Sequence, residues 1–236
     1  MSDGAFRDVW EQRADDWVRW ARSRELDFGF WELNLPAMLE LLPAPGRLTL
    51  DVACGEGRLS RELARLGHRV IGIDSSPSLL AAAREVSPDA ELLLADAGAI
   101  PLDDGAADLA VASMALMTVD DLRAVVGEVA RVLAPGGRLL ITLLHPVDTW
   151  GDAGGSYFEE TAFDNEVVRA AGRMTFRDAH RPLAAYFRAL EDAGFAIERF
   201  REPEPDEDYF RRHPDAERLR GRPFLLHLRA VLTSEP

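Results

Sequence analysis

The sequence predicts an α/β protein built on a doubly wound parallel β-sheet. After residue 46, short apolar runs alternate with segments whose apolar residues recur at helical spacing. Most of the runs are nearly continuous, which is typical of strands that helices cover on both faces. Strand–helix alternation of this kind builds a parallel sheet with right-handed crossovers. At 236 residues, the chain has the size of one large domain.

The elements follow in a clear order. Residues 5–42 are predicted to be helical, and the prolines and glycine at 43–46 end this segment. Five strands are predicted at Arg47–Ala53, His68–Asp74, Glu91–Asp96, Asp108–Ala115 and Arg138–His145. The helices between them are predicted at Arg58–Leu66, Ser76–Glu85 and Asp120–Leu133. We expect Asp120 to cap the last of these helices.

The pattern changes after His145. Residues 147–178 are predicted to be irregular, and a helix at Pro182–Ala193 ends at Gly194. Two further strands are predicted at Ala196–Glu202 and Pro223–Leu232. The Pro-, Asp- and Arg-rich segment between them is expected to be a mobile loop.

Composition excludes several classes of function. The chain has 41 acidic and 27 basic residues, a net charge of −14, which disfavours binding to nucleic acids and anionic membranes. No apolar stretch approaches the roughly 20 residues that span a bilayer, and the N-terminus lacks the pattern of a secretory signal. The single cysteine, Cys54, fits a reducing cytoplasm, where we expect the protein to be. No cluster of His, Cys and carboxylates has metal-ligand spacing, so no metal is expected.

Acidic residues and a glycine turn follow three successive predicted strands. Gly55 and Gly57 allow a sharp turn after the first strand. Asp74 ends the second strand, at the spacing of an acid that accepts hydrogen bonds from a ribose. Asp96 ends the third strand, where its carboxylate and the Ala97 amide could bind adenine. Because ligands of such sheets bind beyond the carboxyl ends of the strands, this pattern indicates a nucleoside-containing ligand.

Four motifs in this order carry a resemblance to a known family. They are DVACGEG, VIGIDSSPSLLAAAR, LLLADAGAIPLDDGAADLAVASMAL and RVLAPGGRLLITLLHP, within residues 47–146. The chain resembles class I S-adenosylmethionine-dependent methyltransferases, and most closely the small-molecule subgroup called type 11. The resemblance implies a Rossmann-like, seven-stranded sheet with an antiparallel last strand, and S-adenosyl-L-methionine as cofactor.

The resemblance also implies which residues bind the cofactor. It places Asp51 and the glycine loop near the methionine part, and the acids of the next two strands at the ribose and the adenine. Ser113 and Met114 would lie near the sulfonium. The predicted cofactor-binding residues are Asp51, Ala53, Gly55, Gly57, Asp74, Ser75, Asp96, Ala97, Ser113 and Met114. Ala53 departs from the family, which commonly has glycine there.

Catalytic and substrate-binding candidates come from outside the glycine loop. His145 ends the fifth predicted strand and is a candidate general base. The alternative is a histidine bonded to neighbouring backbone. Trp17, Trp20, His145 and Tyr157 are candidates for binding the acceptor, because aromatic rings can hold a flat molecule or a cation.

We therefore expect one methyltransferase domain over residues 1–236. It would comprise a helical lid at 1–42, a cofactor-binding core at 47–146, a substrate-side insertion at 147–180 and a C-terminal helix and β-hairpin at 181–236. The predicted reaction methylates O, N or C of a small aromatic or secondary metabolite. The first alternative is a cofactor-binding protein of this fold without transferase activity. The second, a nicotinamide-dependent oxidoreductase, is disfavoured because Ser60 replaces the third glycine of the dinucleotide fingerprint. The sequence does not indicate the acceptor or the oligomeric state.

Overall fold

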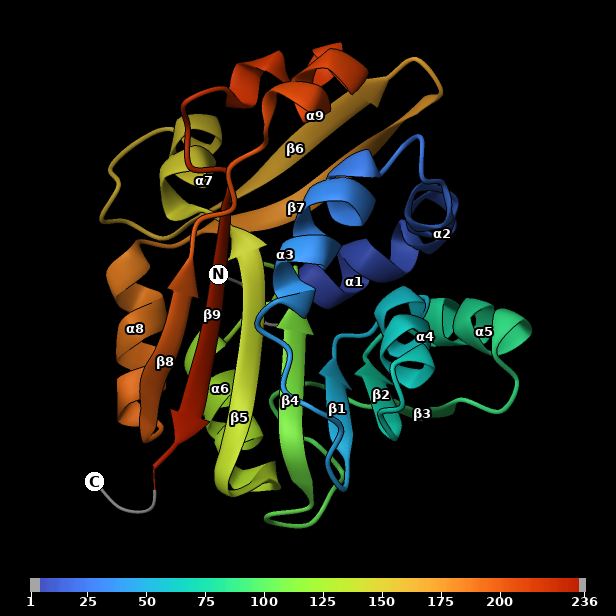
Figure 1. Cartoon of the computed structure of the whole chain (residues 1–236), viewed down its shortest axis with the longest axis vertical. Helices are drawn as coiled ribbons and strands as arrows, with labels where there is room; N and C mark the ends of the chain where they lie inside the picture. The colour runs from blue at the N-terminus through green and yellow to red at the C-terminus, as the bar shows by residue number, and fades with distance from the viewer. Residues whose placement is uncertain (1–4, 234–236) are drawn as a thin grey trace.

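A seven-stranded β-sheet forms the centre of the protein (Figure 1). The computed structural model describes residues 5–233. The strands lie in the order β3-β2-β1-β4-β5-β9-β8, and β9 is antiparallel to both of its neighbours. Their bounds are β1 Thr49–Val52, β2 Val70–Asp74, β3 Glu91–Leu94, β4 Ala107–Ser113, β5 Leu133–Leu144, β8 Phe195–Arg201 and β9 Leu225–Leu232. The predicted Rossmann-like sheet with an antiparallel last strand is confirmed.

The strand order reverses at β1, which fixes where a ligand can bind. Thr49 of β1 is paired with Val70 of β2 on one side and with Leu109 of β4 on the other. Because all three strands are parallel, their carboxyl ends meet at one edge of the sheet, with the helices of the two halves on opposite faces. A crevice is expected at this point.

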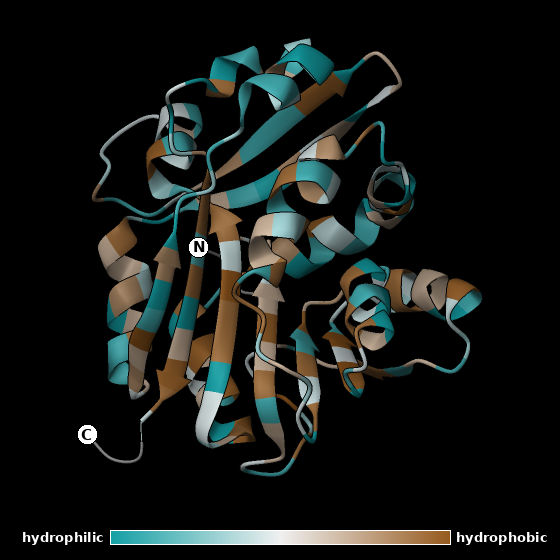
Figure 2. Cartoon of the chain, in the orientation of Figure 1, coloured by the Kyte–Doolittle hydropathy of each residue, from teal (hydrophilic) through white to brown (hydrophobic). Residues whose placement is uncertain are grey.

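Helices cover both faces of the sheet, as the continuous apolar strands require. The helices that follow the strands are α4 Arg58–Arg65, α5 Pro77–Val86, α6 Leu122–Val132 and α8 Leu183–Asp192. Leu109 and Val111 of β4 pack with residues of α3 and α4, whereas Ala110 and Ala112 pack with residues of α6 and α8. Successive residues of a strand point to opposite faces, so both sets are buried. Figure 2 shows hydrophobic residues concentrated in these central strands.

The N-terminal helices lie at the carboxyl edge of the sheet (Figure 1). They are α1 Ala5–Gln12, α2 Ala14–Arg22, the π-helix η1 Gly29–Asn34 and α3 Leu35–Leu39. This agrees with the helical prediction for residues 5–42, and residues 1–4 of the expected lid lie outside the described residues.

Two segments that were predicted to lack regular structure contain helices and strands. Residues 147–178 contain most of α7 Pro146–Ala153 and of a hairpin of β6 Thr161–Arg169 and β7 Gly172–His180, which forms its own two-stranded sheet. The expected mobile loop between the last two strands contains α9 Glu207–Arg212 and the 3₁₀ helix η2 Pro214–Leu219. Asp206 caps α9 by accepting a hydrogen bond from the Tyr209 amide at 2.7 Å. Both predictions were wrong because these elements are stabilised by residues far away in the sequence: the hairpin packs on the N-terminal helices, and the α9–η2 segment packs on the main core.

The N-cap of α6 was also predicted one residue too early. Asp121, not Asp120, precedes the helix, and its Oδ1 accepts a hydrogen bond from the Ala124 amide at 3.0 Å. The side chain of an N-cap must reach the amide two or three residues on, and Asp121 has the extended backbone that allows this.

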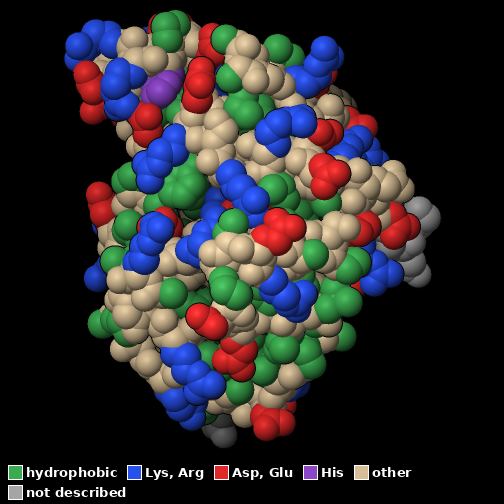
Figure 3. All heavy atoms as spheres, turned by 90° about the vertical axis from the view of Figure 1, so that its right-hand side faces the viewer, with side chains coloured by type: hydrophobic (Ala, Val, Ile, Leu, Met, Phe, Trp, Pro, Cys, Tyr) green, Lys and Arg blue, Asp and Glu red, His purple; other side chains and the backbone are tan. Residues whose placement is uncertain are grey.

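Acidic and basic side chains are interspersed on the face shown in Figure 3. Within residues 5–233, none of the helices combines the length and the apolar character that crossing a bilayer would require.

Candidate functional site

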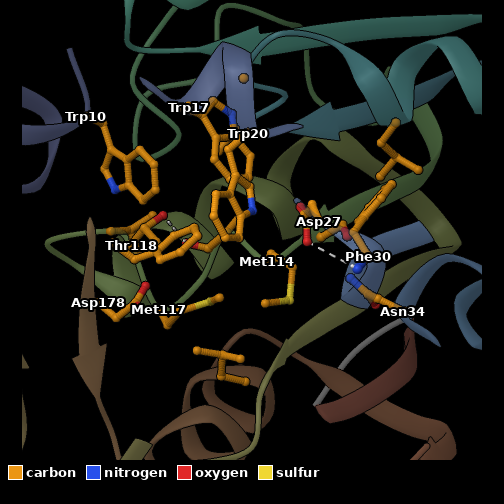
Figure 4. A pocket seen from close by; sticks show the side chains of 18 of the residues that line it. Trp10, Trp17, Trp20, Asp27, Phe30, Asn34, Met114, Met117, Thr118 and Asp178 are labelled. Atoms are coloured by element: carbon orange, nitrogen blue, oxygen red, sulfur yellow. Dashed lines mark hydrogen bonds between the residues drawn. The ribbon is translucent and has the colours of Figure 1, made fainter. Parts of the chain in front are cut away.

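A cavity of about 520 Å³ opens at the carboxyl edge of the sheet. Its volume falls within the roughly 300–1,000 Å³ of sites that bind small molecules and cofactors. The ends of β1, β2, β3 and β4 form one wall. Residues of the N-terminal helices, the β6–β7 hairpin and the α9–η2 segment form the other (Figure 4). We call the first the strand wall and the second the cover.

The loop between β1 and α4 brings backbone close to this cavity. Gly55 and Gly57 have φ angles of +57° and +77°, a region that side chains rarely adopt. Ala53 also lies in the left-handed region, at φ +54°, where the family commonly has glycine. A Cβ atom on Gly55 would lie 3.0 Å from Nε1 of Trp17. The loop therefore has a glycine where the Trp17 side chain of the cover packs against it.

Asp51 lies at the base of the loop, fully buried. The Ser60 hydroxyl donates a hydrogen bond to its Oδ2 at 2.6 Å. Burial raises the pKa of Asp51 to about 7, against the effect of this hydrogen bond, and the nearby Asp74 raises it further. A strongly perturbed carboxyl group of this kind, at the wall of a cavity, is typical of functional sites.

Asp74 ends β2 and links two loops of the strand wall. Its Oδ2 accepts a hydrogen bond from the Gly55 amide at 2.8 Å, and its Oδ1 accepts one from the Ser76 amide at 2.9 Å. Burial raises the pKa of Asp74. Each carboxylate oxygen can accept two hydrogen bonds, so each retains capacity for one more. The side chain lines the cavity, where those bonds can go to a ligand.

The third acid and the end of β4 complete this wall. Asp96 Oδ1 accepts a hydrogen bond from the Gly98 amide at 2.8 Å, which leaves Oδ2 for another donor. Ser113 and Thr142 share a hydrogen bond between their hydroxyls at 2.9 Å. Met114 has a φ of +55°, an uncommon backbone conformation for a side-chain-bearing residue. Of the ten predicted cofactor-binding residues, all except Gly57 line the cavity.

The substrate-binding candidates divide into two groups. Trp17 and Trp20 line the cavity. His145 does not: its Nδ1 accepts a hydrogen bond from the Val147 amide at 3.1 Å and caps α7, while its Nε2 lies 3.1 Å from Glu202. Burial lowers the pKa of His145. The structure thus places His145 in its alternative role, bonded to neighbouring backbone.

Tyr157 also lies outside the set of residues that line the cavity. Its hydroxyl accepts a hydrogen bond from the Leu183 amide at 3.0 Å, at the start of α8. Its ring packs against Trp150 of α7, with centroids 6.0 Å apart. These contacts give Tyr157 a place in the packing of α7 and α8.

Two polar residues of the cover line the cavity and were not found from the sequence. Asp178, near the end of β7, is buried and faces the cavity. Asn34, at the end of the π-helix, is 2% exposed, and neither its amide nitrogen nor its oxygen has a partner among residues 5–233. Predicting the hairpin would have placed Asp178 on the inward face with Phe176, two residues before it. Asn34 has no comparable signal, because only tertiary structure brings it to the cavity.

Two sets of contacts join the N-terminal helices to the strand wall. Arg22 of α2 pairs with the buried Glu56 of the glycine loop at 3.1 Å. Glu11 of α1 accepts hydrogen bonds from the hydroxyls of Ser76 and Ser78, at the start of α5. The cover is thus attached at the ends of β1 and β2, on both sides of Asp74.

The segment that supplies the strand wall matches a known family. Residues 50–141 match the family model described as "Methyltransferase domain". The match includes the glycine loop and all three acids, and the geometry above places these on one cavity. Residues 50–141 are a class I S-adenosylmethionine-dependent methyltransferase domain.

Relatives of this methyltransferase domain are found among bacterial proteins. An uncharacterised methyltransferase of Mycobacterium bovis is 43% identical over 99 residues, 42% of this chain and 40% of the relative. A demethylmenaquinone methyltransferase of Renibacterium salmoninarum is 30% identical over 146 residues, 61% of this chain and 58% of the relative. The chain thus spans between two fifths and three fifths of these two relatives.

The methyltransferase fold is also found in solved structures. An S-adenosylmethionine-dependent methyltransferase of Mesorhizobium loti is similar with a TM-score of 0.66 and 27% identity. The similarity covers 83% of this chain and 96% of that one. The cofactor of this family of domains is S-adenosylmethionine.

Proposed function

We propose that the protein binds S-adenosylmethionine in the cavity and transfers its methyl group to O, N or C of a small molecule. One observation carries this proposal: Asp74, Asp96 and the glycine loop converge on a single cavity from adjacent strand ends. When bound, S-adenosylmethionine supplies a methyl group that is activated by the positive charge on sulfur. The chain then has to bind the cofactor and the acceptor, align the reacting atoms and exclude water. We assign these tasks to the two walls.

The residues of the strand wall fit this cofactor. We assign the two oxygens of Asp74 to the ribose hydroxyls, and Asp96 with the Ala97 amide to the adenine. The positive-φ glycine loop brings backbone close to the place of the methionine part, and Ser113 and Met114 lie where the sulfonium would be. The carboxylates of Asp74 and Asp96 retain the free acceptor capacity that their roles need.

Charge favours the same ligand over a dinucleotide. Three acids of the strand wall, Asp51, Asp74 and Asp96, line the cavity. Carboxylates attract the cationic sulfonium and ammonium groups, and they would repel the two negative charges of a pyrophosphate. This supports the methyl donor and disfavours the nicotinamide alternative.

The cover supports an aromatic or otherwise apolar acceptor. Trp10, Trp17, Trp20 and Phe176 bring four aromatic rings to the cavity wall. Rings of this kind bury large apolar areas and attract cations to their faces. A small metabolite with a flat apolar part fits such a wall, and the enclosed space would keep water from the reacting atoms.

Calorimetry with S-adenosylmethionine tests the cofactor site. We expect Asp74→Ala to weaken binding at least about tenfold, because charge-assisted hydrogen bonds contribute about 1.5–3 kcal/mol. Asp103→Ala is the matched control, since Asp103 is exposed and lies outside the set of cavity-lining residues. Equal affinities for wild type and Asp74→Ala would contradict the assignment, as would tight binding of NAD(H) without binding of S-adenosylmethionine.

Transfer itself is tested with a panel of phenols, amines and indoles followed by mass spectrometry. We expect at least one acceptor to gain a methyl group when wild-type protein and cofactor are both present. Binding of the cofactor with no methylated product across the panel would favour a cofactor-binding protein without transferase activity.

A further inference from the structure

We propose that the acceptor is an organic amine, which Asp178 binds as its ammonium ion in the aromatic part of the cavity. Asp178 would also take the proton that the nitrogen must lose before it can be methylated. This inference rests on the proposed function and names its substrate class.

Asp178 differs from the other buried acids that line the cavity in accepting no hydrogen bond from the described residues. Four acidic residues that line the cavity are less than 9% exposed: Asp51, Glu56, Asp74 and Asp178. The first three accept hydrogen bonds from Ser60, from two arginines and from two backbone amides, respectively. Asp178 accepts none from any group within residues 5–233, and no arginine or histidine there pairs with it. A buried carboxylate is costly without a partner, so a cationic ligand is the group that this position lacks.

Aromatic rings surround the approach to this carboxylate. Phe176 and Asp178 are two residues apart in β7 and both line the cavity, so they lie on the same inward face of the hairpin. The Phe176 ring lies 6.4, 6.1 and 5.6 Å from the rings of Trp10, Trp17 and Trp20, centroid to centroid. Four aromatic rings near one unpaired carboxylate are a suitable environment for an organic ammonium ion.

The hairpin is fixed so that Asp178 lies near the end of β4. The Ala179 amide donates a hydrogen bond to the Met117 carbonyl at 2.8 Å. The buried Arg181 donates to the Leu116 carbonyl at 2.9 Å. Both acceptors belong to the loop that follows Met114, where we place the sulfonium. Figure 4 shows Asp178 beside Met117 on one side of the cavity, and Asn34 on the opposite side.

Asn34 offers a second polar contact to the same acceptor. Both of its amide atoms are buried without a partner among the described residues, and the side chain lines the cavity. A hydrogen-bonding group at the far end of the amine would satisfy it. The amine nitrogen would then be held at the Asp178 side, with Met114 between Asp178 and Asn34 (Figure 4).

The charges around Asp178 suit it to exchange a proton near neutral pH. Burial, with the carboxylates of Asp152 on α7 and Asp164 on β6, raises the pKa of Asp178 to about 7. On the α8 side lies the hydroxyl of Tyr186, near both Asp178 and Arg181. Arg181 donates to loop carbonyls and pairs with Glu160 at 3.0 Å, so it is not available to pair with Asp178.

The proposed step balances as follows. The ammonium ion gives one proton to a carboxylate oxygen of Asp178, which leaves a neutral amine with a free electron pair. That pair forms the new N–C bond while the C–S bond breaks and its electrons remain on sulfur. The products are a methylated ammonium ion, a neutral thioether and a protonated Asp178, which releases its proton to solvent as the products leave.

Binding of matched probes to the full chain tests this without requiring turnover. The protein is saturated with S-adenosylhomocysteine, and calorimetry compares phenethylamine with phenethyl alcohol, and tryptamine with tryptophol. Each pair shares a skeleton and differs in the ammonium group. We expect each amine that binds to do so at least about tenfold more tightly than its alcohol at pH 8. Asp178→Asn should remove this preference and leave the affinity for S-adenosylhomocysteine unchanged.

Two controls make the test specific. Glu166→Gln, on the exposed side of the same hairpin, should retain the preference of the wild type. In the wild-type protein, lowering the pH from 8 to 5.5 should weaken amine binding but not alcohol binding, because Asp178 becomes protonated. This second measurement stands even if Asp178→Asn fails to fold.

The outcomes separate the two proposals. If S-adenosylhomocysteine does not bind the wild type, the proposed function and this inference both fail. If it binds and neither pair shows a preference for the amine, or the preference persists in Asp178→Asn, this inference alone is overturned.

Discussion

The strand wall and the cover of the cavity are built on different principles. In the strand wall, each buried acid is bonded to a neighbouring hydroxyl, amide or arginine, and the backbone of the glycine loop adopts conformations that few sequences allow. In the cover, both amide atoms of Asn34 face the cavity without a partner among residues 5–233, and the Asp178 carboxylate accepts no hydrogen bond from those residues. Acids that neighbouring groups hold in place, with some acceptor capacity left over, suit a ligand common to a whole family. A site left unbonded suits the ligand of one member.

The largest expected effect concerns how the cover is attached. Arg181 is 1% exposed and donates hydrogen bonds to the carbonyls of Leu116 and Val119. Arg181→Met keeps much of the volume but leaves these buried carbonyls without a donor, so we expect a loss of about 3 kcal/mol in the free energy of unfolding. Urea denaturation measures it.

Arg173→Met is the matched control for this variant. Arg173 lies on the same hairpin, is exposed and has only a 3.6 Å pair with Glu166, so its removal should cost less than about 0.5 kcal/mol. Equal losses for the two variants would mean that Arg181 does not hold the cover to the loop after β4.

A second expectation concerns how stability depends on pH, because each wall contains a buried aspartate with a raised pKa. Burial raises the pKa of both Asp51 and Asp178 to about 7 in the folded protein, above the value of 3.8 of an exposed aspartate. The folded state then holds these protons more tightly than the unfolded chain. Their contribution to stability is complete below about pH 4 and is lost as the pH rises to about 7.

Asp178→Asn removes the part of this loss of stability at high pH that Asp178 causes. We expect the variant to melt at least about 3 °C above the wild type at pH 8, and the difference to shrink toward pH 4. Asp51→Asn should show a similar trend for the strand wall. Thermal melts at four pH values measure both, and a difference that does not change with pH would contradict the assignment.

The smallest expected effect tests the cap of α6, which borders the cavity. Asp121→Ala removes the hydrogen bond to the Ala124 amide and should cost about 1 kcal/mol of stability. Asp120→Ala should cost much less, because its side chain makes no hydrogen bond within the described part of the chain. The reverse order would favour the cap that the sequence pattern suggested.

The strand wall could be predicted from sequence because its signals are local. Continuous apolar runs mark strands such as β4, and an acid or a glycine turn follows each strand at a fixed place. These features depend on neighbouring residues of the chain, and the structure places all of the predicted cofactor residues except Gly57 at the cavity.

The hairpin and the α9–η2 segment of the cover could not be predicted in the same way, for reasons that the hairpin illustrates. Its inward face combines Phe163 and Val167 with Asn165 and Asp178, so the alternation of apolar and polar residues that marks a strand is lost. Polar residues lie on this face because it borders a cavity rather than a core. His145 is a case in which a local signal misled the prediction. Its place at a strand end suggested catalysis, but a helix begins at Pro146 and the His145 imidazole caps that helix.

Among residues 5–233, neither strand of the β6–β7 hairpin pairs with the seven-stranded sheet. Its hydrogen bonds to other parts of the chain involve Arg13, Thr149 of α7 and two loops. Its length and inward residues can therefore change without altering the register of any of the seven central strands. Exchange of residues 161–178 for the equivalent segment of another family member would give a chimera with a new acceptor preference. The cofactor site would pass to that chimera unaltered.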